Sequence, residues 1–277
     1  MSNSSGQDTV DKNSAIKAIV ASAVKSFAAG FQARHDGEID NPNGTINMKI
    51  HNVFIEALGK EIQYYSALAR SLDSSLGYML EDMAISIAEL NYDVRTNVEG
   101  PLYPSQTSKI AELLEIYKSH AGKPCIEDYH CLREMNIHDA SRIKRHDSDY
   151  YLIDKETDKH YLIELKIGGD LDNKKARSEK EAILEQYAIL SNTLPKEVEI
   201  IIYFATAYNR FGENKIWRQE RVRQFFCDNE LLIGADFWNF VCKSSDGYKT
   251  VLSCYRDNAH FIKEALEDIK NLYLGDN

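Results

Sequence analysis

The segment VEIIIYFAT, residues 198–206, restricts the fold of this 277-residue chain more than any other feature. It is dense in β-branched and aromatic side chains and is too short to be a typical helix. Such a run is typical of a strand that is covered on both faces of a sheet. The chain must therefore supply helices, or a second sheet, to cover it.

Helical patterns precede and follow this strand. Residues 14–32 carry an apolar stripe with helical spacing, and residues 48–90 form a long helical region with an expected break at Ser74, Ser75 or Gly77. Residues 108–120 and 174–191 are two further helices with the same kind of spacing. The sequence therefore predicts a mixed α/β fold, with a small central sheet flanked by helices and a helical N-terminal part.

The composition suits a folded protein. Hydrophobic residues make up 43% of the chain and charged residues 27%, with only 14 Gly and 5 Pro, which excludes a disordered or low-complexity chain. We expect a single domain over residues 1–277, with a helical extension over 1–47 and a core over 48–277. No apolar run approaches the roughly 18–20 residues of a membrane span, and the N-terminus lacks a signal-peptide pattern, so we expect no membrane association.

The cysteines and the net charge bear on the cellular location of the protein and on its partners. The five cysteines form no CxxC pair, so neither a disulfide framework nor a zinc site is indicated and a cytoplasmic location fits best. The net charge of −10, taken alone, argues against nucleic acid as a partner. Residues 209–223, however, hold five basic residues against two acidic ones, so a basic face on an acidic protein is compatible with the sequence.

Residues 146–173, HDSDYYLIDKETDKHYLIELKIGGDLDN, carry the chemistry. Two β-prone runs surround a polar turn, which predicts a hairpin. With Lys155–Asp158 as the turn, apolar side chains meet apolar side chains, and Asp149 lies opposite Glu164. A slip of one residue would scramble both faces, which favours this register.

Two carboxylates placed in this way repel each other, because opposed side chains in a sheet have Cβ atoms about 4.5–5.5 Å apart. A divalent cation such as Mg²⁺ resolves the repulsion. Lys166, two residues after Glu164, lies on the same face and can orient a water or stabilise charge on a phosphate. The alternative is a solvated edge strand, which the apolar neighbours disfavour. Asp147 is the second choice as partner to Glu164, and Asp154 is set aside because it falls in the turn on the other face.

These residues resemble a known family. An Asp on the first strand, then ELK at 164–166, then a helix and another strand, is similar to the PD-(D/E)xK nuclease fold, with Ser148–Asp149 in place of the PD pair and the proline missing. Residues 69–88, 165–190 and 203–226 resemble the TdeIII-type restriction endonucleases, and the likeness covers most of the chain beyond its N-terminal part. The resemblance implies a restriction-endonuclease-like core and a Mg²⁺-dependent type II enzyme with GGNCC as its target.

The resemblance also implies roles for single residues. Asp149 and Glu164 would hold the metal, and Lys166 would be the catalytic lysine. Enzymes of this fold often add a glutamate from a preceding helix, for which Glu81 is the best match, ahead of Asp82; a surface glutamate is the alternative. The implied reaction hydrolyses double-stranded DNA to 5′-phosphate ends. A palindromic target implies a homodimer, and a restriction system implies a cognate DNA methyltransferase.

Three segments are candidates for contact with DNA. Gly168–Gly169 allows a sharp turn into a helix that begins with basic residues, and residues 209–223 hold the Arg and Lys side chains that can read guanine. Residues 142–146, just before Asp149, can also grip the DNA backbone, with an ordinary surface run as the alternative. The alternative for the first segment is a helix cap followed by a solvated face, and Trp217 is more often a packing residue than a stacking one. The candidate DNA contacts are Lys174, Lys175, Arg177, Arg145, Asn209, Arg210, Lys215, Arg218 and Arg221.

Two other functions stay open on the sequence. The same fold serves DNA-repair and structure-specific nucleases, which would give a smear or fork-dependent cleavage rather than discrete bands. A catalytically silent DNA-binding module is the other, and it is disfavoured by the intact set of Asp149, Glu164 and Lys166.

Overall fold

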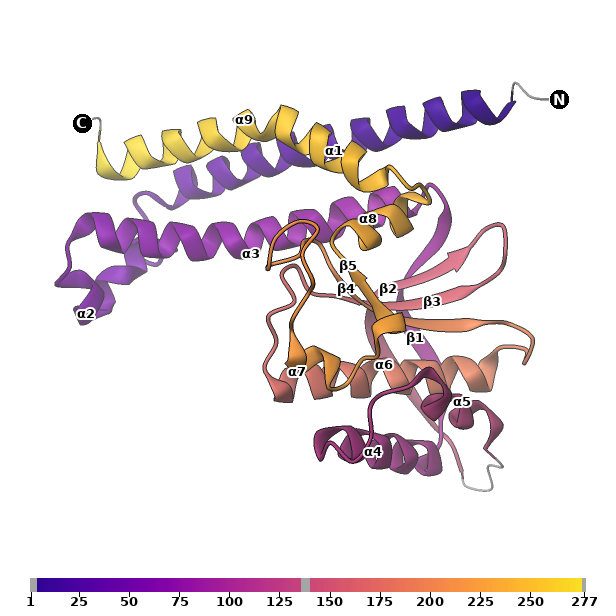
Figure 1. The fold of residues 1–277 in the computed structure, drawn as a ribbon. Helices are drawn as coiled ribbons and strands as arrows, with labels where there is room; N and C mark the ends of the chain where they lie inside the picture. Colours follow the sequence, from indigo (N-terminus) through magenta and orange to yellow (C-terminus); the bar gives the residue numbers. More distant parts are fainter. Residues whose placement is uncertain (1–3, 136–139, 276–277) are drawn as a thin grey trace. The chain divides into compact units, whose positions relative to one another are not determined.

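The structure is a computed structural model that describes residues 4–135 and 140–275. The chain divides into two compact units (Figure 1). One unit contains the chain up to residue 86 and again from residue 249, and the other contains residues 87–248. The expectation of a single nuclease domain stays a prediction.

The first unit is helical. Phe31 on the first helix, Tyr64 and Leu68 on the third, and Ile269 and Tyr273 on the last form its apolar core. Aromatic contacts reinforce this core, with the Tyr64 and Tyr273 ring centroids 6.0 Å apart. The elements that contribute to this unit are α1 (Ser4–Glu38), η1 (Asn47–His51), α2 (Val53–Glu56), α3 (Lys60–Ala88) and α9 (Gly247–Leu274).

The predicted break in the long helical region lies elsewhere. Helix α3 continues through Ser74, Ser75 and Gly77, so the prediction of a break there is wrong. The chain instead leaves α2 and turns at Gly59, whose φ of +93° is a conformation that glycine adopts without strain. Buried Met79 and Met83, on the same helix as these small residues, supply the packing that offsets their weak helix propensity.

Helix α1 contains a segment that the sequence analysis did not anticipate. Lys12–Glu38 is long enough and apolar enough, with a window of mean hydropathy 1.3, to cross a membrane on those criteria alone. The segment is broken by polar residues, which is why a search for an uninterrupted apolar run passes over it. Its residues Ile16, Val20 and Val24 are buried at helical spacing, as in a helix that packs within a protein. One such helix is a weak indication of a membrane span.

The second unit is built on a five-stranded mixed sheet in the order β1-β2-β3-β4-β5. The first three strands are antiparallel, and β3, β4 and β5 run parallel to one another. Helix α6 makes the crossover from β3 to β4, as parallel neighbours require. The elements are β1 (Tyr92–Leu102), α4 (Pro104–Lys118), α5 (Ile126–Glu134), β2 (Arg142–Asp154), β3 (His160–Leu165), α6 (Asn173–Thr193), β4 (Ile200–Thr206), α7 (Glu220–Arg223), η2 (Asp228–Glu230), β5 (Leu231–Ile233) and α8 (Ala235–Cys242).

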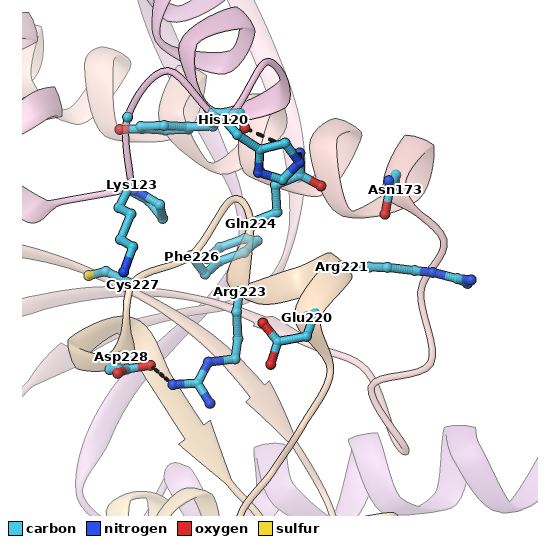
Figure 2. Close-up of a pocket in the computed structure, with 13 residues that line it drawn as sticks. His120, Lys123, Asn173, Glu220, Arg221, Arg223, Gln224, Phe226, Cys227 and Asp228 are labelled. Carbon is cyan, nitrogen blue, oxygen red and sulfur yellow. Dashed lines mark hydrogen bonds and ion pairs between the residues drawn. The ribbon is translucent and has the colours of Figure 1, made fainter.

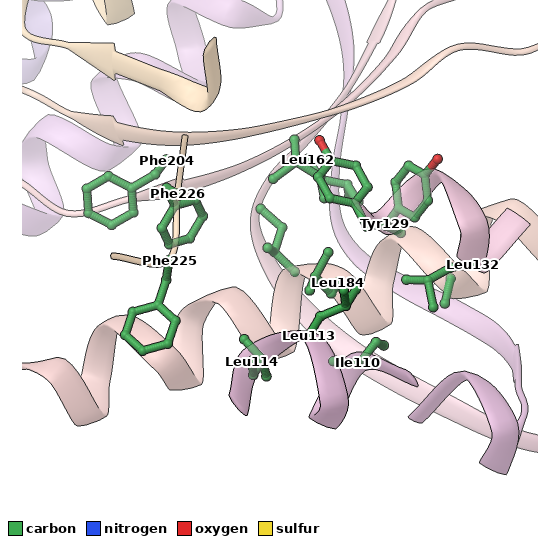
Figure 3. Close-up of a cluster of buried hydrophobic side chains, with 14 of the residues drawn as sticks. Ile110, Leu113, Leu114, Tyr129, Leu132, Leu162, Leu184, Phe204, Phe225 and Phe226 are labelled. Atoms are coloured by element: carbon green, nitrogen blue, oxygen red, sulfur yellow. The ribbon is translucent and has the colours of Figure 1, made fainter. Parts of the chain in front are cut away.

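Side chains alternate between the two faces of the sheet. Leu162 and Phe204 point into the large core beneath the sheet with Leu184 of α6 and side chains of α4 and α5 (Figure 3). On the opposite face, Tyr161 packs edge-on against Phe240 of α8, with ring centroids 5.0 Å apart. The predicted α/β fold with a small mixed sheet flanked by helices is confirmed.

Candidate active site

The hairpin has the register that the sequence predicts. Tyr150 pairs with Ile163 and Ile153 pairs with His160 across β2 and β3. The turn is closed by a hydrogen bond from the backbone N–H of Asp154 to the carbonyl of Lys159. Continuing this register by one residue brings Asp149 opposite Glu164 at the end of β3.

A bulge in β2 lies next to Asp149. Arg95 of β1 pairs with Tyr151, but Asn97 pairs with Asp147, so residues 148–150 lie opposite a single residue of β1. Bulges redirect side chains and are frequent beside active sites. Here the Asp149 carboxylate turns toward β3, where its Oδ2 accepts a hydrogen bond of 3.1 Å from the backbone N–H of Leu165.

Lys166 brings the two acidic residues together. Its backbone N–H donates to the carbonyl of Ala205 on β4, so the residue is held in line with the sheet just beyond β3. Its Nζ forms an ion pair with Glu164 and lies 3.9 Å from Oδ2 of Asp149. Glu164 is buried, whereas the Asp149 and Lys166 side chains are about one-third exposed. The three side chains therefore meet at an open edge of the site.

The charges in this cluster are strongly coupled. Burial, with a further contribution from the Asp149 carboxylate, raises the pKa of Glu164 to about 8. Burial opposes the charge on Lys166, but the carboxylate of Glu164, followed by those of Asp149 and Glu179, outweighs it and raises the pKa of Lys166 above its ordinary value. Negative charge is therefore in excess, and a further cation would stabilise the cluster.

The donor set suits one class of metal. Among the described residues, no three His, Cys, Asp or Glu side chains are arranged to enclose a metal ion. Asp149 and Glu164 offer carboxylate oxygens only, the ligands of a hard cation. Mg²⁺ is usually held by one or two carboxylates together with waters and substrate phosphates, so these two residues fit it without a complete protein cage.

Gly169 forms the turn that leads away from Lys166. Its φ is +65°, and a Cβ at this position would lie 2.7 Å from Cγ2 of Thr206 and 3.2 Å from Cζ2 of Trp217. Only glycine fits both the backbone and the space. The chain then enters α6, capped by Asp172, whose carboxylate accepts from the backbone N–H of Lys175 at 2.8 Å.

Comparison with known protein families matches residues 12–259 to the family described as "Type II restriction endonuclease, HinfI". The chain belongs to this family. No curated protein and no solved structure matches. As a member of the HinfI family the protein is a type II restriction endonuclease, a site-specific nuclease whose substrate is DNA.

Asp170 joins two of the predicted DNA-contact segments of this HinfI-family enzyme. It follows Gly169, forms an ion pair with Arg210, and accepts a hydrogen bond of 3.1 Å from Nε2 of Gln219. Asn209 also has a structural task, because its Nδ2 donates to the carbonyl of Lys215 at 2.6 Å. Arg210 and Asn209 thus shape the loop after β4, and their predicted contact with DNA stays a prediction.

The other candidate DNA contacts fall into two groups. Arg177 lies 3.9 Å from Oε2 of Glu181 and is half-buried. The remaining candidates are exposed and, within the part of the chain that the structure describes, form no ion pair, so their charges are available to phosphates. They are Arg145, Lys174, Lys175, Lys215, Arg218 and Arg221.

Arg221 lines a hollow of about 750 Å³ between the α4–α5 connection, the start of α6 and the α7 region. Figure 2 shows Lys123 and Arg221 on its rim and the ion pair of Arg223 with Asp228 on its wall. Neither the acidic pair nor Lys166 lines this hollow. The hollow is therefore separate from the cluster of Asp149, Glu164 and Lys166, and its lining holds both basic and acidic side chains.

The remaining predicted residues have clear places. Trp217 is buried in the core beside Phe204, as its packing interpretation expects. Asp154 is buried in the turn and pairs with Lys243, whereas Asp147 is exposed on β2. Glu81 lies on α3 in the helical unit, whereas the cluster belongs to the sheet unit, and the role of Glu81 stays a prediction.

Sequence reasoning missed two charged residues on α6. Glu179 lies 3.5 Å from Nζ of Lys166, and Lys180 is fully buried in an ion pair with Glu230. Both lie on or beside the helix face that carries Ala176 and Ile183. The available signal in the sequence was that these two charged residues fall on or beside the helical spacing of the buried apolar positions.

Proposed function

We propose that this HinfI-family enzyme is a Mg²⁺-dependent endonuclease in which Asp149 and Glu164 hold the metal and Lys166 is the catalytic lysine. The convergence of these three side chains at the end of β3 is the observation that supports the proposal most strongly. The resemblance to TdeIII-type enzymes supports GGNCC as the target and 5′-phosphate ends as the product.

The metal and the surrounding side chains have different roles in this proposal. When bound, Mg²⁺ supplies neutralisation of phosphate charge and activation of a water molecule. The backbone N–H of Leu165 fixes the Asp149 carboxylate, and the ammonium of Lys166 donates hydrogen bonds to the phosphate or orients the attacking water. The exposed cations of α6 and of the loop after β4 hold the DNA backbone beside the cluster.

The setting of the enzyme follows from its substrate. A palindromic site is cut on both strands, which calls for two copies of the chain related by two-fold symmetry. The cell that contains such an enzyme needs a DNA methyltransferase of the same specificity to protect its own sites. We place the enzyme in the cytoplasm, where the DNA of the cell is found.

Mapping of cleavage products tests the proposal. Purified protein is incubated with Mg²⁺ and DNA of known sequence, and the ends are sequenced. We expect cuts at every GGNCC site, none after chelation of Mg²⁺, and a loss of about 10²-fold or more in the Glu164→Ala variant. The matched Glu181→Ala variant should cleave as the wild type does. A smear without preferred sites, or equal activity in Glu164→Ala, contradicts the proposal.

A further inference from the structure

Glu179 lies on α6 beside the end of β3. Its side chain is 26% exposed, and Lys166 is its one ion-pair partner among the described residues, with Oε1 at 3.5 Å from Nζ. Helix α6 returns along the face of the sheet on which Leu162 and Glu164 lie, so its early turns are level with the site. The contact therefore follows from the crossover that joins β3 to β4.

The ammonium of Lys166 has three N–H donors and meets three carboxylates, those of Glu164, Asp149 and Glu179. In the proposed function, Asp149 and Glu164 turn their oxygens to the metal. Glu179 is then the carboxylate that still serves the lysine. A partner of this kind keeps the ammonium charged and aimed.

We propose that Glu179 is a positioning residue that holds Lys166 in its working orientation while the other two carboxylates serve the metal. The inference rests on the proposed function, because it assigns Glu179 through the role of Lys166. Glu181 provides the contrast on the same helix: its side chain is 41% exposed and lies 3.9 Å from Arg177, away from the cluster.

The test separates positioning from metal binding. DNA cleavage is measured as kcat and KM, and binding of Ca²⁺ to the DNA-free protein is measured by calorimetry. We expect Glu179→Gln to lower kcat by about 10- to 100-fold, with KM and the Ca²⁺ affinity within about twofold of wild type. Glu179→Asp, which restores the charge at shorter reach, should recover part of the loss, and Glu181→Gln should match wild type.

Each contrary outcome has a distinct meaning. An unchanged kcat in Glu179→Gln, or a Ca²⁺ affinity that falls as far as in Glu164→Gln, overturns the positioning role alone. Absence of cleavage by the wild-type protein overturns the proposed function and this inference with it.

A separate surface of the helical unit carries unusual apolar exposure. Seven large apolar side chains between residues 48 and 65 are exposed, and Phe54 is the most open at 83%. Concentrated exposure of this kind marks an interaction site, whereas single exposed apolar residues are ordinary. We call this surface the 48–65 patch, which consists of Met48, Ile50, Val53, Phe54, Leu58, Ile62 and Tyr65.

The charges around the 48–65 patch balance. Lys49 and Lys60 stand against Glu56 and Glu61, and none of the four forms an ion pair within the described ranges 4–135 and 140–275. The patch is thus neutral on a chain of net charge −10. The net charge makes two copies of the chain repel each other on average, whereas this neutral surface adds no repulsion, and the Lys and Glu side chains of a second copy can complement these.

A recess also lies beside the patch. A hollow of about 270 Å³ adjoins the patch and is lined by Ile50, His51, Lys60 and Tyr64, among others. An exposed Phe54 and a hollow within the same segment give a protrusion and a recess. In a two-fold interface each copy offers both, so an aromatic anchor from either copy finds a pocket in the other.

We infer that the 48–65 patch is the surface through which two copies of this chain associate. Sedimentation velocity over a range of protein concentrations tests this inference. The wild type should sediment as a dimer, and Phe54→Asp and Leu58→Asp should each raise the dimer Kd by about 30-fold or more. Tyr78→Asp is the matched control, because Tyr78 is 69% exposed on α3 outside the patch and its replacement should leave the dimer intact.

A wild-type protein that stays monomeric at micromolar concentration overturns the inference, and so does a dimer that both patch variants retain. Circular dichroism confirms that each variant is folded before it is compared. A monomeric wild type that still cuts DNA would refute this surface while leaving the proposed catalytic function standing.

Discussion

Charged side chains that leave water need partners. Three groups of charged residues in this protein meet that need to different degrees. Lys180 and Glu230 are fully buried and pair only within the core, where Tyr129 and Phe226 rings flank the ammonium. Asp154 is buried beside the partly exposed Lys243. Around Lys166, where Asp149, Glu164 and Glu179 meet, the charges do not cancel, which is the property expected of a cation site rather than of a structural pair.

Replacement of Lys180 by Met tests the buried pair. The variant leaves the Glu230 carboxylate in the core without its counter-charge, so we expect a loss of about 3–5 kcal/mol in the free energy of unfolding, measured with urea. The double variant with Glu230→Gln should recover most of this loss, since no unpaired charge remains. A single variant as stable as the wild type would contradict the assignment.

The environment of Asp154 predicts that the free energy of unfolding depends on pH. Burial alone would raise its pKa, but the backbone N–H groups of Glu156 and Thr157 and the Lys243 ammonium, at 3.0 Å, hold the pKa below its ordinary value. The carboxylate therefore stabilises the fold above the unfolded pKa of about 3.9, and this contribution disappears as the pH falls through the lower folded value.

We expect Asp154→Asn to lower the free energy of unfolding by about 1–3 kcal/mol at pH 7, and the difference from wild type to shrink below about pH 4. Urea unfolding at several pH values measures it. Glu156→Gln removes the exposed partner of the same lysine and should change stability by less than about 1 kcal/mol. A difference for Asp154→Asn that is constant from pH 7 to pH 3 would refute the assignment.

At the scale of elements, the turn between β3 and α6 joins the strand that carries Glu164 to the helix that carries Glu179. Gly169 is the residue on which it depends, because its backbone is left-handed and a Cβ at this position would clash with Thr206 and Trp217. Asp172 then caps α6. Small changes in this turn should therefore reach both the cluster and the basic helix start.

Gly169→Ala should destabilise the protein by at least about 1–2 kcal/mol from backbone strain and should lower cleavage activity. Gly30→Ala is the matched control: Gly30 lies within α1 with open space around its Cα, and the change should stabilise the protein by about 0.5–1 kcal/mol. Thermal unfolding and a cleavage assay measure the pair. Equal effects of the two variants would show that the turn has no special role.

The elements differ in how far the sequence predicts them. The β2–β3 hairpin and β4 are predictable because alternation and apolar density determine their pairing. Strand β1 escapes prediction since it is a polar edge strand that contains Gly100 and Pro101, which an edge tolerates. The position of β1 depends on close packing against α6, because a Cβ on Gly100 would lie 2.8 Å from Cγ2 of Ile189.

The sequence likewise predicts one part of the candidate site and not another. The opposition of Asp149 and Glu164 follows from a register that spacing alone predicts. The bulge beside Asp149 and the approach of Glu179 depend on pairing with β1 and on the path of α6, which lie far apart in sequence. Contacts set by the crossover and by an edge strand leave no local pattern, so sequence reasoning could not find them.

At the scale of the whole molecule, the family match extends over residues 12–259 and thus includes parts of both compact units. The sheet unit contains the cluster and the exposed cations, and the helical unit contains the 48–65 patch. We interpret these as separate surfaces for chemistry, DNA and a second copy of the chain. This division rests on the proposed function and on the inferred dimer.

The central claim is that Asp149 and Glu164 bind a divalent cation beside Lys166. Crystals of the protein with DNA and Mn²⁺, measured at the manganese absorption edge, test it most directly. We expect an anomalous peak within about 2.5 Å of a carboxylate oxygen from each of the two acidic residues, and no such peak in Glu164→Gln. A peak at other side chains, with none at this pair, would contradict the account.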